Sequence, residues 1–143
     1  MPLSKRDRDL VSQAAALIRA RFYPDRHHLA AALRTRDGQV FMALNLDTYV
    51  GRCAVCAEAA VVARAVTDGA EAPETVVAVR WRGRDAPRVA SPCGVCREFL
   101  VDYGDPWVIV ENGSGARRVR ASALLPTRYE RREAPRGKKS RAR

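Results

Sequence analysis

Cys56-Ala57-Glu58 and, further along the chain, Pro92-Cys93-Gly94-Val95-Cys96-Arg97 are the two stretches that decide the fold of this protein. Each stands where a helix is expected to begin. Residues 54–66 are rich in alanine and lack Gly and Pro, and a proline such as Pro92 is typical of the first turn of a helix. The sequence therefore predicts helices over residues 54–66 and 93–103, with the cysteines at their N-termini.

The cysteines and the carboxylate of these motifs make up the donor set of a catalytic metal site. The positive end of a helix dipole and the free amide groups there stabilise thiolates. Three thiolates, from Cys56, Cys93 and Cys96, hold a zinc ion and leave its fourth tetrahedral position open, which distinguishes a catalytic site from a structural one. Glu58 is then placed to act as general base and afterwards as general acid. The pattern indicates activation of water at zinc beside a proton shuttle.

The first part of the chain predicts a helix followed by a hairpin. Residues 7–20 carry apolar side chains at helical spacing, and Ser4 is a residue typical of a helix cap. Two short apolar runs, residues 29–33 and 39–44, flank Asp37-Gly38, which is a strong signal for a hairpin turn. These two runs are expected to pair as antiparallel strands.

Three further strands are expected at residues 75–81, 107–110 and 117–120. The connection over residues 111–116 is too short for a parallel crossover, so the last two strands must be antiparallel. Helices and strands then follow one another in an order typical of a sheet covered on both faces. The sequence predicts an α/β fold with three layers, α/β/α, around a five-stranded mixed sheet.

Length and composition are those of one compact domain. The chain has 143 residues, of which 47% are hydrophobic, enough for a single core. We assign residues 1–129 to a catalytic domain and residues 130–143 to a basic tail. The tail holds seven Lys or Arg and two Glu, which is half of the net charge of +10. Because it has no apolar residue to anchor it, we expect it to be disordered, and its basic charge does not by itself indicate a nucleic-acid partner.

The location is expected to be cytoplasmic, without a membrane span. No apolar run approaches the roughly 18 residues that a membrane-spanning helix needs. The first eight residues are charged, and no apolar run of signal-peptide type follows them. All four cysteines fall in two Cys-x-x-Cys pairs, which in such a chain favour metal binding or redox chemistry over disulfides.

The two motifs resemble those of the zinc-dependent cytidine deaminase family, whose signatures are Cys-Ala-Glu or His-Ala-Glu and Pro-Cys-x-x-Cys. The resemblance extends from about residue 29 to residue 129. It implies one zinc ion per subunit, held by Cys56, Cys93 and Cys96, with Glu58 as the proton shuttle. It further implies hydrolytic deamination of a cytidine-like nucleoside to its uridine counterpart, with release of ammonia.

The same resemblance implies a set of substrate-binding residues. Asn45 matches the asparagine that binds the ribose, and Asp47 stands where nucleoside deaminases carry glutamate. Ala57, inside the first motif, is expected to contact the substrate. His27 occupies the place of an aromatic residue before the first strand. Tyr129 resembles the aromatic residue that closes over the base, often from a neighbouring subunit, so a homo-oligomer is expected, with a tetramer favoured over a dimer.

Two departures from the family pattern concern the substrate more than the reaction. Ala59 occupies the place where many tetrameric cytidine deaminases have an arginine that offsets the thiolate charge, and Arg97 is the expected substitute. The missing arginine and the opening Met1-Pro2-Leu3-Ser4 resemble the blasticidin S deaminase branch, whose substrate is a modified cytosine nucleoside. The loop before Cys56 is longer than in that branch.

Other interpretations of the cysteines remain open at this point. By spacing alone, the Cys53-x-x-Cys56 pair with the Cys93-x-x-Cys96 pair also matches a four-cysteine structural zinc site. That interpretation leaves Glu58 and Asn45 unexplained, so we interpret Cys53 as a thiol outside the metal site. A thioredoxin-like redox function would need one such pair rather than two.

A nucleic-acid cytosine deaminase or an RNA-binding module is the remaining alternative, because of the basic tail. Members of the resembled family that act on polynucleotides commonly have a helix between their last two strands, which makes those strands parallel. The short connection over residues 111–116 excludes that arrangement here. The sequence therefore argues against nucleic acid as a partner, and the expected partner is a small nucleoside.

Overall fold

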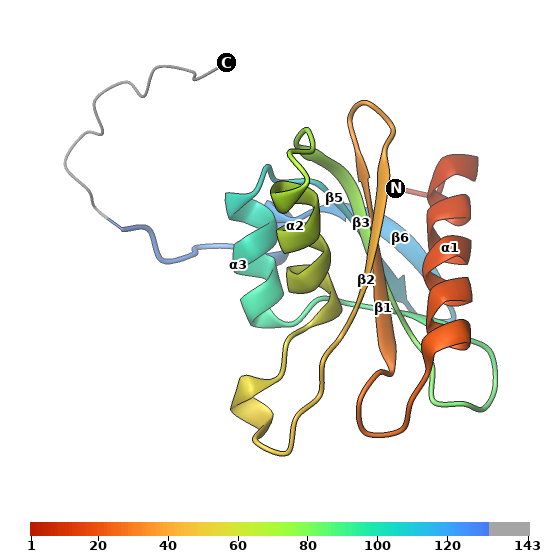
Figure 1. Ribbon diagram of the computed structural model, residues 1–143. Coiled ribbons are helices and arrows are strands. Elements are labelled where there is room, and N and C mark those ends of the chain that lie inside the picture. The colour runs from red at the N-terminus through yellow and green to blue at the C-terminus, as the bar shows by residue number, and fades with distance from the viewer. Residues whose placement is uncertain (132–143) are drawn as a thin grey trace.

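The computed structural model describes residues 1–131, so most of the tail, whose disorder we predicted, lies outside the described residues. A central sheet separates one helix from two others (Figure 1). Helix α1 (Lys5–Arg21) covers one face of the sheet, and helices α2 (Ala57–Thr67) and α3 (Gly94–Asp102) cover the other. The predicted three-layer arrangement is confirmed. None of the helices within residues 1–131 combines the length and the apolar character needed to cross a membrane.

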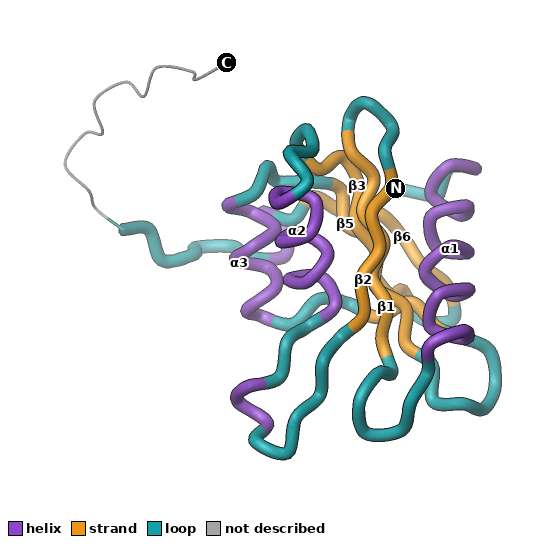
Figure 2. The backbone as a smooth tube through the Cα atoms, viewed as in Figure 1, coloured by secondary structure: helices purple, strands orange, loops and turns teal. Residues whose placement is uncertain are grey.

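The main path of the sheet has the strand order β2-β1-β3-β5-β6, visible as the central layer in Figure 2. The strands are β1 (Leu29–Thr35), β2 (Val40–Leu44), β3 (Pro73–Arg80), β4 (Arg88–Ala90), β5 (Trp107–Asn112) and β6 (Gly115–Arg120). Strand β1 pairs antiparallel with β2 and with β3, whereas β3 and β5 are parallel because α3 lies in the crossover between them. Strands β5 and β6 are antiparallel, as the short connection requires. The sheet is thus mixed, as predicted.

The predicted number of five strands is wrong, because β4 adds a sixth. Strand β5 pairs with only the first half of β3, at residues 75–77, and β4 pairs antiparallel with residues 78–80 on the rest of that strand. A strand of three residues directly after Pro87 is too short to show an alternating pattern. Strand β4 forms because β5 leaves a segment of β3 unpaired. The local sequence of residues 88–90 gives no sign that this pairing partner is available.

Side chains of the central strands alternate between two cores. In β3, Val76 and Ala78 pack under α2 and α3, whereas Val77 and Val79 pack under α1. All four are at most 2% exposed. Because both faces of the sheet are buried, β3 carries apolar residues almost continuously rather than in alternation. The strand therefore packs against α2 and α3 on one face and against α1 on the other.

Helix α1 begins with a capping box in which Ser4 and Asp7 exchange hydrogen bonds. The Asp7 backbone N–H donates to Ser4 Oγ at 3.2 Å, and the Ser4 backbone N–H donates to Asp7 Oδ2 at 3.0 Å. Asp7 is also fully buried and pairs with the guanidinium groups of Arg34 and Arg118, each at 3.1 Å. Burial alone would raise the pKa of Asp7, but these hydrogen bonds outweigh it and lower the pKa to about 2. One carboxylate therefore ties α1 to β1 and β6.

Replacing Asp7 by alanine is expected to lower the free energy of unfolding at neutral pH by about 3 kcal/mol, because removal of one partner leaves buried charge uncompensated. The pKa of Asp7 is depressed from 3.8 to about 2 in the folded protein. Its stabilising contribution is therefore complete above about pH 4 and is lost as the pH falls toward about 2. Urea unfolding of both proteins over this range should show their difference shrinking. Asp9→Ala, an exposed site on the same helix, is the control and should change little.

Candidate active site

The N-termini of α2 and α3 meet at one end of the sheet, the lower end in Figure 1. Cys56 is the N-cap residue of α2 and Cys93 that of α3, as the sequence predicted. Helix α2 begins three residues later than expected. A 3-10 turn, η1 (Gly51–Cys53), and a bridge between Val55 and Leu46 occupy the chain before it. The cysteines thus stand at two positive helix ends.

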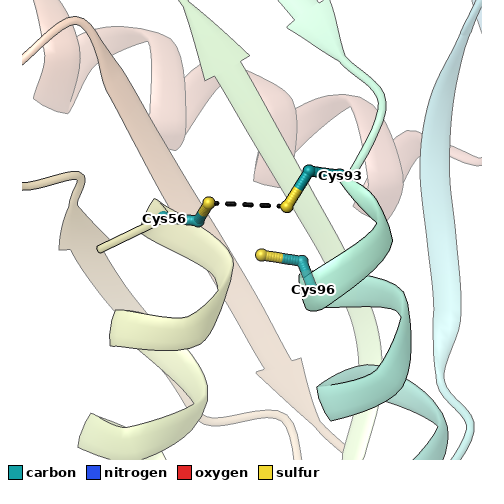
Figure 3. Close-up of side chains that lie close together, drawn as sticks. All are labelled: Cys56, Cys93 and Cys96. Carbon is teal, nitrogen blue, oxygen red and sulfur yellow. Dashed lines mark hydrogen bonds between the residues drawn. The ribbon is translucent and has the colours of Figure 1, made fainter. Parts of the chain in front are cut away.

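The sulfur atoms of Cys56, Cys93 and Cys96 all lie within 4.8 Å of one another (Figure 3). Those of Cys56 and Cys93 are 3.5 Å apart. Two sulfurs bound at about 2.3 Å to a tetrahedral zinc ion are separated by roughly 3.8 Å, so this spacing suits zinc. Within residues 1–131, no other group of three or more His, Cys, Asp or Glu side chains is arranged in this way.

The charges around the three thiols also suit a cation. Burial raises the pKa of Cys96, and the negative charge of Glu58 raises it further. Burial and the neighbouring Cys93 thiol raise the pKa of Cys56. At Cys93, burial is outweighed by hydrogen bonds, first that of the Cys96 backbone N–H, and its pKa is lowered. A divalent cation relieves the repulsion among the thiolates and displaces their protons, so the donor set fits zinc.

Glu58 lies beside the sulfur cluster and is almost fully buried. The side chain is 6% exposed, and its Oε2 accepts a hydrogen bond from Cys96 Sγ at 3.7 Å. Burial raises the pKa of Glu58, although its own backbone amide and Cys96 partly offset the effect. A buried carboxyl group with a raised pKa takes up and releases a proton closer to neutral pH than an exposed one.

A pocket with a volume of about 330 Å³ contains Glu58, Cys56 and Cys93, and Asn45 and Asp47 line it as well. Ala57, the buried first residue of α2, also lines it. The lining comes from the start of β1, the end of β2, the ends of β3 and β4 and the start of α2. The antiparallel registers bring these strand ends together. Three of the five predicted substrate-binding residues, Asn45, Asp47 and Ala57, therefore line one cavity together with Cys56, Glu58 and Cys93.

The polar wall of the pocket is held in place by hydrogen bonds. Asn45 is 2% exposed, and its Oδ1 accepts the backbone N–H groups of His28 and Leu29 at 2.9 Å each. The Nδ1 atom of His28 lies 2.8 Å from Asp47 Oδ2. The amide of Asn45 and the carboxylate of Asp47 therefore have defined positions.

His28, rather than the predicted His27, lines this pocket. The Nδ1 atom of His27 lies 2.8 Å from the backbone oxygen of Asn45, so His27 supports the pocket wall from outside its lining. Contact between His27 and the substrate stays a prediction. Sequence reasoning also missed Arg80, Arg82 and Ser91, which line the pocket. No local feature of the sequence marks these two arginines, since Arg80 is the last residue of β3 and Arg82 lies two residues beyond it.

Arg97 and Tyr129 do not line this pocket. Arg97 donates from Nε to the backbone oxygen of Pro92 and from Nη1 to that of Leu124, both at 3.0 Å, which fastens the 3-10 turn η2 (Ser122–Leu124) to α3. Its role as partner of the thiolate charge stays a prediction. Tyr129 is 81% exposed and follows Arg128, which pairs with Asp102 of α3 at 2.6 Å. Closure over a base by Tyr129 likewise stays a prediction.

Cys53 stands outside the sulfur cluster, as the sequence analysis inferred. It is exposed in η1, and the group that is able to hold a metal ion consists of Cys56, Cys93 and Cys96. The four-cysteine structural site therefore does not form in the described residues. A three-thiol site is the arrangement that leaves a coordination position for chemistry.

Comparison with known proteins agrees with this geometry. Residues 4–112 match the family model of the cytidine and deoxycytidylate deaminase zinc-binding region. The chain is 37% identical over 134 residues to a blasticidin-S deaminase of Bacillus cereus, which covers 90% of this chain and 96% of that protein. It is 34% identical over 77 residues to a probable cytidine deaminase of Dictyostelium discoideum, about half of each chain.

Solved structures show the same fold. The cytidine deaminase of Bacillus anthracis superposes with a TM-score of 0.74 at 23% identity, covering 85% of this chain and 88% of that one. The cytidine deaminase of Mycobacterium tuberculosis superposes with a TM-score of 0.65 at 28% identity, covering 86% and 94%. Together with the zinc-compatible cysteines, these matches show that the chain belongs to the cytidine and deoxycytidylate deaminase family and is a zinc-binding hydrolytic deaminase.

Proposed function

We propose that this enzyme removes the 4-amino group of a cytosine nucleoside by hydrolysis, with the uracil nucleoside and ammonia as products. The observation that carries the proposal is the shared pocket, which is lined by Glu58, Cys56 and Cys93 together with Asn45 and Asp47. A proton-transferring carboxyl group and a metal site serve the reaction at the base. An amide and a carboxylate side chain serve recognition of sugar hydroxyl groups.

The metal site and Glu58 have separate tasks in the proposed reaction. Zinc, when bound, supplies a Lewis acid that makes water reactive near neutral pH. Glu58 takes up one proton of the attacking water and delivers it to the ring nitrogen N3. It then takes up the proton of the hydroxyl group added at C4 and delivers it to the amine, which leaves as ammonia when the C4–N bond breaks. Its burial beside Cys96 keeps bulk water from competing for these protons.

Recognition of the sugar is proposed for the pocket wall that Asn45 and Asp47 form. The Oδ1 atom of Asn45 already accepts two backbone N–H groups. The Nδ2 group of the same amide is therefore the donor that we assign to the sugar. Asp47, held by His28, accepts a sugar hydroxyl group. We further propose that Arg97 offsets the thiolate charge, and that Tyr129 closes the pocket of a neighbouring subunit in a homo-oligomer, with a tetramer favoured over a dimer. The high exposure of Tyr129 supports this proposal.

A modified cytosine nucleoside related to blasticidin S is the second candidate substrate. It is favoured by the 37% identity to the Bacillus cereus blasticidin-S deaminase over nearly the whole chain. Ala59, where many tetrameric cytidine deaminases have arginine, agrees with this candidate.

An ammonia-release assay with the zinc-loaded enzyme tests the proposal. The panel is cytidine, deoxycytidine, free cytosine and blasticidin S. We expect kcat/KM for at least one nucleoside to exceed that for cytosine by about 100-fold or more, since free cytosine cannot use the binding energy of the sugar wall. Release from blasticidin S alone would favour the second candidate. Absence of ammonia from every compound would contradict the proposed function.

A further inference from the structure

The end of β3 carries a cluster of arginines that the reaction at zinc does not use. Arg80 and Arg82 line the active-site pocket and also a second hollow of about 230 Å³ beside it. Arg84 and Arg88 line the second hollow as well, and Asp85 is the one acidic side chain among the described residues that do so. The active-site pocket is therefore continuous with a strongly basic surface.

None of these four arginines forms an ion pair with a carboxylate within residues 1–131. Arg80 and Arg88 are direct register partners on β3 and β4, so their side chains leave the sheet on the same face. Like charges directly opposite each other on neighbouring strands are destabilising. Such a locally unfavourable pair beside an active site is expected where the protein binds an anion.

Trp81 determines the direction of the two arginines that line the active-site pocket. Its ring packs edge-on against Phe22, with 5.4 Å between ring centroids, and its Nε1 donates to the backbone oxygen of Asp85 at 3.1 Å. Trp81 thereby belongs to the core under α1. Because side chains alternate along an extended chain, Arg80 and Arg82 lie on the opposite side from Trp81, where the pocket is.

We propose that Arg80 and Arg82 bind an anionic group, a phosphate monoester or a carboxylate, attached to the sugar of the substrate. This inference rests on the proposed function, which assigns the cytosine to Glu58 and the sugar to Asn45 and Asp47. Both arginines line the pocket that also holds Asn45 and Asp47, so a group that extends from the sugar lies beside them. Their planar forks match the oxygens of phosphate and carboxylate groups. The preferred substrate is then an anionic cytosine nucleoside.

The test compares kcat and KM of the zinc-loaded enzyme on cytidine, cytidine 5′-monophosphate and cytidine 5′-carboxylic acid. We expect kcat/KM to be at least about tenfold higher for one anionic compound than for cytidine, and the better of the two identifies the group. Arg82→Ala should raise KM for that compound about tenfold, and the double variant with Arg80→Ala roughly 100-fold, with kcat nearly unchanged. KM for cytidine should change by less than about twofold. Arg82→Lys should retain part of the effect, since it keeps the charge and loses the fork.

Arg117→Ala is the matched control, because Arg117 is exposed on β6 and lines neither hollow. It should leave every KM unchanged. Added salt should raise KM for the anionic compound and not for cytidine. The proposal is overturned if cytidine is used as well as both anionic compounds, if Arg82→Ala leaves their KM unchanged, or if a single-stranded oligonucleotide is preferred to all three.

A binding measurement separates failure of this inference from failure of the proposed function. If no cytosine compound releases ammonia, the proposed function fails. Calorimetric titration with uridine 5′-monophosphate and with uridine then still tests whether Arg80 and Arg82 bind an anionic group. Binding of the monophosphate that weakens about tenfold in Arg82→Ala supports the site, and equal binding by wild type and variant rejects it.

Discussion

Glu58→Gln is expected to lower kcat for the nucleoside substrate by about 10²- to 10⁴-fold, while the protein keeps one zinc ion per chain. Glutamine preserves the size of the side chain and its place in the buried pocket, but it cannot take up the proton that the reaction releases. The cysteine sulfurs are untouched, so metal binding does not depend on this substitution. Steady-state ammonia release, together with metal analysis of the same sample, measures both quantities.

Glu98→Gln is the control for this experiment. Glu98 lies on α3, two residues after Cys96, and its side chain is 46% exposed and 3.8 Å from Arg128. Its replacement should leave kcat within about twofold, because surface ion pairs contribute little. Near-normal kcat in zinc-loaded Glu58→Gln would show that another group moves the protons.

Cys93→Ala is expected to remove zinc and activity together. Two remaining thiolates cannot complete the three-sulfur site, in which Cys93 at the start of α3 would hold the metal ion together with Cys56 and Cys96. Zinc content should fall well below one ion per chain, and kcat/KM should fall to the background of the assay. Because the metal binds only the folded chain, the melting temperature should no longer rise on addition of zinc.

Cys53→Ser provides the matched control for the loss of zinc. Cys53 is exposed and three residues before Cys56, yet it is not part of the sulfur cluster. The variant should keep one zinc ion per chain and full activity. Loss of zinc in Cys53→Ser would restore the four-cysteine interpretation and contradict the three-thiol site.

The cluster of Cys56, Cys93 and Cys96 and the place of Glu58 beside it could be predicted from the sequence because their placement is local. Cys56 and Glu58 lie within one helical turn, as do Cys93 and Cys96, and the signals for the start of each helix lie in the same short stretches. The antiparallel pairing of β5 and β6 was also predictable, since the length of a connection limits the possible geometry. These features do not depend on contacts with distant parts of the chain.

The wall of the pocket could be predicted only in part. His28 lines the pocket and its neighbour His27 does not. The pairing of β1 with β2 and β3 makes this choice, because strand register sets the direction of each side chain. Strand β4 was missed because it depends on the segment of β3 that β5 leaves open. Arg80 and Arg82, met in the sequence as two of 26 basic residues, have no local feature that separates them from solvated surface charges.

The sequence by itself determined which groups make up the candidate site: three cysteine thiols, one carboxyl group and two helix starts that hold them. Only the tertiary structure decided what surrounds that chemistry. The registers of the strands bring the start of β1 and the ends of β2, β3 and β4 to the N-termini of α2 and α3, and so bring His28, Arg80 and Arg82 into one pocket. The physical reason is that metal ligation and helix capping act over a few residues, whereas strand register is set by hydrogen bonds and packing between segments far apart in the chain.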